Sequence, residues 1–169
     1  MKNGTVIPVF GEAIEIVASS TSTNYAFVIG VQTSPPGGGP PPHRHLGEDE
    51  VFTVFEGEFE FFDGTSWKPF HRGEVRYSLR GTYHGFRNVG QTKGVMMFTT
   101  NGGGLDEYFA EISALELPKD MERLQEISRF YRYQYLSPKI LTVRRYLAEK
   151  ISSEIGAWDL TSNGCGSVR

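Results

Sequence analysis

Four side chains in this sequence have the types and the spacing of a metal-binding group. His43 and His45 are one residue apart, Glu50 follows them, and His84 begins a later apolar run; the chain has 4 histidines in all. In a strand, residues two apart face the same side, so the imidazoles of His43 and His45 are expected to point together. Three imidazoles and one carboxylate suit Fe, Mn, Ni, Zn or Cu, and they leave coordination positions open to a substrate, water or oxygen.

Short strands must position these side chains. Apolar or alternating runs rich in Val, Ile, Phe, Tyr and Thr recur over the first hundred residues, and Gly, Pro and Asp bound them. Many short strands at close spacing favour an all-β sandwich or barrel. The predicted strands cover residues 13–18, 25–33, 50–55, 58–62, 66–70, 74–79, 84–89 and 93–100.

Helical spacing of apolar residues follows the strands. It predicts helices over 104–114 and 118–134, and a third over 140–152. In the second helix an apolar stripe recurs every three residues and is extended by two tyrosines. The stripe comprises Met121, Leu124, Ile127, Phe130, Tyr131 and Tyr135. We therefore expect one domain, with a β-barrel over 1–115, a helical extension over 116–155 and a flexible tail over 156–169.

The stretch around the first two histidines resembles the first cupin motif, G-x5-H-x-H-x4-E-x6-G. All five of its positions agree, and they are Gly37, His43, His45, Glu50 and Gly57. The stretch "GEVRYSLRGTYHGFRN" resembles the second motif, G-x5-P-x-G-x2-H-x3-N, except that Leu79 stands at the proline position. Over roughly residues 8–135 the chain is similar to single-domain cupins of the quercetin 2,3-dioxygenase type.

The resemblance implies a cupin-type β-barrel or jelly roll, followed by C-terminal helices, with a metal ion inside. It assigns His43, His45, Glu50 and His84 as ligands, and it suggests that Glu50 is also a catalytic base. The motif spacing and the strand parity favour Glu50 over its neighbours Glu48 and Asp49 as the carboxylate ligand. Another histidine, His71, matches no ligand position and is expected at the surface.

An aromatic pocket is expected above the metal. Phe52 shares the parity of Glu50 and Phe86 that of His84, and one or more of Met96, Met97 and Phe98 are placed to join them. These side chains are equally expected as ordinary barrel core, since a pocket wall is also packed core. An apolar, aromatic wall suits an aromatic substrate better than a sugar phosphate.

The first functional hypothesis is a metal-dependent dioxygenase that acts on a small aromatic or enolisable substrate, with iron as its first metal and Zn, Ni, Mn or Cu as alternatives. A second is a redox-silent zinc cupin that acts as a cyclase or isomerase. A third is a non-catalytic cupin that binds a small molecule. The metal and the uptake of oxygen distinguish the first two hypotheses.

The composition limits the expected partners and cellular location of the protein. The net charge is −3 with a pI of about 5.8, which gives no support for nucleic acid or a membrane surface as a partner. The single cysteine, Cys165, excludes an internal disulfide, and the N-terminus lacks the apolar core of a signal peptide, so a cytoplasmic protein is expected. Val51, Thr53 and Phe55 are expected to face outward, so this strand is apolar on both faces and its outer face needs a cover. The C-terminal helices or a second subunit could supply the cover, and the resemblance to cupins, which commonly pair through their sheets, implies a homodimer.

Overall fold

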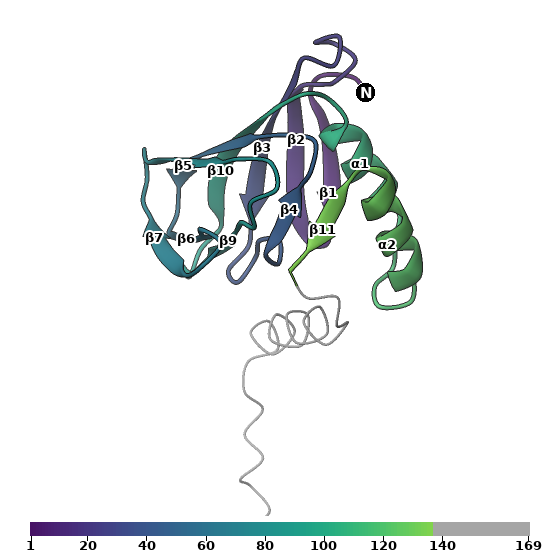
Figure 1. Ribbon diagram of the computed structural model, residues 1–169. Helices are drawn as coiled ribbons and strands as arrows, with labels where there is room; N and C mark the ends of the chain where they lie inside the picture. Colours follow the sequence, from purple (N-terminus) through teal and green to yellow (C-terminus); the bar gives the residue numbers. More distant parts are fainter. Residues whose placement is uncertain (137–169) are drawn as a thin grey trace, which may run out of the picture.

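The computed structural model describes residues 1–136, which form short antiparallel strands and two short helices (Figure 1). This confirms the predicted all-β architecture with helices after the strands. In chain order the elements are β1 (Thr5–Val9), β2 (Glu12–Ala18), β3 (Phe27–Ser34), β4 (His43–His45), β5 (Glu50–Glu56), β6 (Phe59–Phe62), β7 (Trp67–Phe70), β8 (Val75–Ser78), β9 (Gly85–Asn88), β10 (Gly94–Asn101), α1 (Leu105–Ile112), α2 (Met121–Phe130) and β11 (Tyr133–Tyr135).

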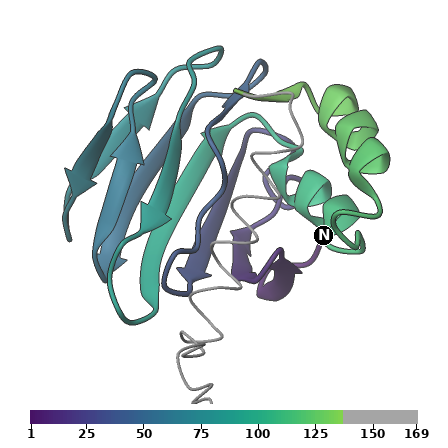
Figure 2. The ribbon, with the colours of Figure 1, turned by 90° about the horizontal axis from the view of Figure 1, so that it is seen from below.

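The strands form three hydrogen-bonded sheets. The largest has six strands in the order β1-β2-β3-β10-β5-β8, a second has the order β7-β6-β9, and the third pairs β11 with β4. Every pairing between strands is antiparallel. Two views show α1 and α2 together at one side of the strands, next to β1 and β11 (Figures 1 and 2). The helices therefore lie at the side of the strands that carries β1 and β11, and they do not cover the outer face of the large sheet (Figures 1 and 2).

Alternate residues along the strands are buried and form the core. In β5, Glu50, Phe52 and Val54 are buried, and the residues between them are partly exposed. Phe98 of β10 lies opposite Phe52 in the ladder, and burial of an aromatic ring of this size stabilises the fold by about 2–3 kcal/mol. On the other side of β10, Gly30 faces Phe98 without a side chain, and a Cβ there would lie 2.2 Å from the Phe98 ring. The glycine thus makes room for the ring.

Two glycines in the stretch of the first motif have backbone conformations or contacts that leave no room for a side chain. Gly57 connects β5 to β6 with a φ of 92°, a backbone conformation that residues with a side chain rarely adopt. Gly39, in the run before β4, has a φ of 130°, and a Cβ there would lie 2.1 Å from the carbonyl oxygen of Phe86. Only a residue without a side chain lets the loop approach β9 so closely.

The predicted strands agree with the structure to within about two residues, but three strands, β1, β4 and β11, were not predicted. The second predicted helix was too long. α2 ends at Phe130, Arg132 takes a left-handed φ of 63°, and the chain then forms β11. The alternation Tyr-Gln-Tyr favours a strand, and β4 offers it a partner. Phe130, placed in the apolar stripe, is instead 79% exposed.

The third predicted helix, over 140–152, and the predicted tail, over 156–169, lie outside the described residues. The domain division at 115/116 stays a prediction. Within residues 1–136, no helix combines the length and the apolar character needed to cross a membrane.

Candidate metal centre

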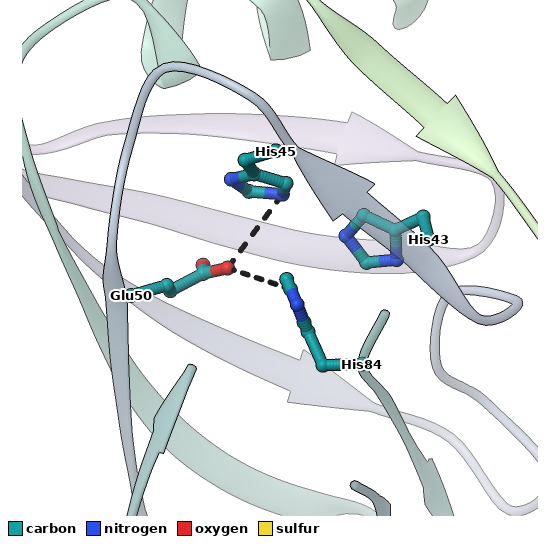
Figure 3. Close-up of side chains that lie close together, drawn as sticks. All are labelled: His43, His45, Glu50 and His84. Carbon is teal, nitrogen blue, oxygen red and sulfur yellow. Dashed lines mark hydrogen bonds and ion pairs between the residues drawn. The ribbon is translucent and has the colours of Figure 1, made fainter. Parts of the chain in front are cut away.

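Three neighbouring segments bring the candidate ligands together. β4 supplies His43 and His45, β5 begins with Glu50, and His84 immediately precedes β9. His43 and His84 exchange two backbone hydrogen bonds of 2.8 Å, which fix the start of β4 beside the start of β9. Figure 3 shows the four side chains pointing toward one another. Segments 34 residues apart in the sequence, at Glu50 and His84, are thus in direct contact.

The four side chains are close enough to share one ion. One ligand atom from each lies within 4.8 Å of all the others. Glu50 Oε2 is 3.1 Å from His84 Nε2 and 3.6 Å from His45 Nε2. Ligands bound at about 2.1 Å from one ion lie at most about 4.2 Å apart, so small side-chain shifts are sufficient. His45, Glu50 and His84 are buried and His43 is half-buried, so the cluster opens toward His43.

Backbone carbonyl groups orient two of the imidazoles. His43 Nδ1 is 2.9 Å from the carbonyl oxygen of Pro41, and His84 Nδ1 is 3.1 Å from that of Thr82. Because a carbonyl only accepts, each Nδ1 carries the proton, and the Nε2 of each neutral ring keeps a free lone pair. Metal-ligating histidines are usually held in this way. These two rings therefore have the tautomer that a metal ion requires.

Burial shifts the pKa values within the cluster. Burial, followed by the neighbouring His84, lowers the pKa of His43 to about 4, and burial also lowers the pKa of His84 to about 4. Burial, together with the neighbouring histidines, lowers the pKa of His45 well below its usual value. Burial raises the pKa of Glu50 to about 8. The imidazoles are therefore neutral at pH 7, as metal ligation requires, whereas Glu50 must lose a proton to become a ligand.

The donor set fits a divalent ion of the first transition series. Imidazole nitrogens and a carboxylate bind Fe, Mn, Ni, Cu and Zn, and four protein ligands leave room on an octahedral ion for further ligands. Among the described residues, this is the group of histidine and acidic side chains that is close enough to hold an ion. The cluster is thus compatible with a divalent metal ion.

The cluster opens into a cavity of about 110 Å³. Phe52, Phe86 and Phe98 line it, as proposed for a substrate pocket, but Met96 is not among its lining residues. Met96 is fully buried and faces Val54 in the ladder, one inward position farther from the cluster than Phe98, so it packs in the core.

The sequence did not predict that α1 and β11 form one wall of the cavity. Four residues of α1 and two tyrosines of β11 contribute this wall. The α1 residues have the i, i+3, i+4, i+7 spacing of one helix face, so the helix could be predicted, but the surface against which it packs could not. The residues are Leu105, Tyr108, Phe109, Ile112, Tyr133 and Tyr135.

Three other polar residues near the motif lie in different environments. Asp49 is held at the surface by Arg80, whose Nε donates to it at 2.9 Å. His71 is exposed and is not a member of the cluster. Glu48, in contrast, is buried, and its Oε2 lies 3.6 Å from Nδ1 of His45. Burial raises the pKa of Glu48 to about 7.

Comparison with known proteins assigns the fold. Residues 30–100 match the cupin domain family. An oxalate-binding protein of Thermotoga maritima is 28% identical over 81 residues, which are 48% of this chain and 67% of that protein. The crystal structure of a predicted oxalate decarboxylase of Thermotoga maritima superimposes with a TM-score of 0.53 at 22% identity, covering 60% of this chain and 96% of that one.

A second solved structure supports the same assignment. An RmlC-like cupin of Shewanella frigidimarina has a TM-score of 0.54 at 18% identity, covering 62% of this chain and 88% of that one. Likeness at such low identity shows the fold alone. Together with the match over residues 30–100, it shows a cupin-type β-fold, whose clustered histidines and glutamate are compatible with a divalent metal ion.

Proposed function

We propose that this cupin is a metal-dependent dioxygenase that acts on a small aromatic or enolisable molecule. The observation that carries the proposal is the position of the cluster of three histidines and one glutamate at the end of an aromatic cavity. His43, His45, Glu50 and His84 would hold the ion, with iron as the first candidate. When bound, such an ion acidifies a coordinated hydroxyl group and supplies the redox chemistry through which dioxygen reacts with an electron-rich carbon.

The residues of the chain would prepare the substrate. Phe52, Phe86 and Phe98 offer flat apolar contacts that favour a planar ring and exclude water. The carboxylate of Glu50 would take the proton from an enol or phenol hydroxyl, and its raised pKa suits it to that task. The resulting anion supplies the electrons for its reaction with dioxygen. Both oxygen atoms then remain in the products, so the reaction needs no external reductant.

A second candidate is oxalate binding, which the Thermotoga maritima relative favours by its name. The cavity argues against a small dianion as the main ligand. Among the described residues that line it there is no lysine or arginine, and most are apolar or aromatic. A dianion would have only the metal ion to neutralise it, whereas planar apolar molecules match the walls.

The test measures dioxygen uptake by protein reconstituted separately with Fe(II), Mn(II), Ni(II), Cu(II) and Zn(II). Flavonols, catechols, β-diketones and oxalate would be offered, with Glu50→Gln as the control. We expect uptake with at least one redox-active metal and an enolisable aromatic substrate, and none with Glu50→Gln. No uptake with any redox metal, together with zinc as the metal in protein purified without chelator, would favour a zinc cyclase or isomerase. Saturable binding without turnover would favour a binding protein.

A further inference from the structure

The third imidazole of the cluster, that of His45, lacks the backbone acceptor that the other two have. Its Nδ1 is buried and has no hydrogen-bond partner among the described residues. The nearest acceptor is Oε2 of Glu48, at 3.6 Å, and that oxygen is also buried without a partner. Two unsatisfied buried atoms of complementary type thus face each other, and a shift of about half an ångström would give a hydrogen bond.

The other oxygen of Glu48 is held by β11. The hydroxyl group of Tyr133 donates to Glu48 Oε1 at 3.3 Å. Tyr133 also lies opposite His45 in the pairing of β11 with β4, and the centres of the two rings are 4.2 Å apart. One residue of β11 therefore contacts both the imidazole and the carboxylate beside it.

We infer that Glu48 is a positioning residue of the metal centre: it accepts the Nδ1 proton of His45, which keeps Nε2 of that ring directed at the ion, and Tyr133 holds Glu48 in place. The inference rests on the proposed metal site. It gives all three imidazoles the same arrangement, an oxygen acceptor at Nδ1 and a free lone pair at Nε2. Carboxylate–histidine–metal arrangements of this kind fix the ring and strengthen the ligand.

The inference also gives the segment after the matched family region a part in the site. Tyr133 lies outside residues 30–100, and α2, which precedes it, packs against β11. The helices thereby support a strand that contacts a candidate ligand. The metal centre of this chain accordingly depends on residues that the two cupin motifs do not contain.

The test measures the dissociation constant of Co(II) by competition with a chromophoric chelator, and the visible spectrum of the Co(II) protein. Glu48→Ala should weaken binding about 10- to 100-fold and shift the spectrum, because the His45 ring loses its acceptor. Glu48→Gln should recover part of the affinity, since an amide oxygen also accepts. Tyr133→Phe should weaken binding several-fold, because the carboxylate loses its hydroxyl donor.

Two variants serve as controls. Asp106→Asn changes a buried carboxylate that accepts from the backbone of Ser20, and Tyr131→Phe removes a hydroxyl group that donates to Glu111. Both should leave the Co(II) affinity and spectrum unchanged. If wild-type protein binds Co(II), and folded Glu48→Ala and Tyr133→Phe bind it with wild-type affinity and spectrum, the inference is wrong while the metal site stands. If folded wild-type protein binds no metal, the proposed function fails as well.

Discussion

The charge state of the four clustered residues follows from their burial. Charged groups in an apolar interior are costly unless they are paired, so the imidazoles and Glu50 favour their neutral forms. Nδ1 of His84 donates to a backbone carbonyl, so its Nε2 is an acceptor. The protonated carboxyl of Glu50 can donate to it across the 3.1 Å that separates them. An incoming cation must therefore displace one proton.

We expect metal binding at pH 7 to release about one proton from Glu50. Its pKa of about 8 keeps the carboxyl protonated below that pH, whereas the ligand form is ionised. The apparent affinity should therefore rise about tenfold per pH unit as the pH rises toward 8. Calorimetry of Zn(II) binding in two buffers of different ionisation enthalpy measures the released protons. Identical enthalpies in the two buffers would contradict this assignment, and Glu50→Gln should remove the effect.

Among the elements, a strand could be predicted from the sequence only where its own residues alternate between apolar and polar. β5 and β10 alternate cleanly, so both their extents and the inward direction of Glu50 and Phe52 could be predicted. β11 could not be predicted in this way. Its three residues continue a helical pattern, and they form a strand because β4 lies beside them. The α1 wall of the cavity could not be predicted either, because it depends on contacts with residues that are distant in the sequence.

Replacement of Gly39 by alanine should destabilise the fold by about 2–4 kcal/mol. The new Cβ would clash with the carbonyl oxygen of Phe86 in a backbone conformation that alanine rarely adopts. Thermal or denaturant unfolding measures the loss. Gly47→Ala is the matched control, since Gly47 does not have a positive φ and a Cβ added there would meet no atom within 4 Å. Equal stability of the two variants would show that the approach of this loop to β9 is not constrained.

At the scale of the whole molecule, the outer face of the six-stranded sheet carries apolar side chains. Val75 and Tyr77 of the edge strand β8 are 61% and 58% exposed, and they lie opposite Thr53 and Val51 of β5. Phe55 continues this face and is also exposed. The described helices do not cover it, because α1 lies on the inner side, where Phe109 contacts Phe98.

We expect this outer face to join two copies of the chain in a homodimer. Light scattering at micromolar concentration should give about twice the monomer mass of 18.9 kDa. Val75→Glu should shift the protein toward the monomer, because it places charge on the apolar face, and it should leave metal binding intact. A mass near that of the monomer for the wild-type chain would reject the dimer.

The pairing of β4 with β11 also constrains the order in which parts of the protein can fold during synthesis. The side-chain hydrogen bond from Arg44 to Gln134 spans 90 residues, and the contact of Tyr133 with Glu48 spans 85. During synthesis, all four candidate ligands leave the ribosome well before β11 exists. Until β11 has been synthesised, the edge of β4 that pairs with it stays open. Any support that Tyr133 and Gln134 give to the candidate metal centre is therefore available only at a late stage of folding.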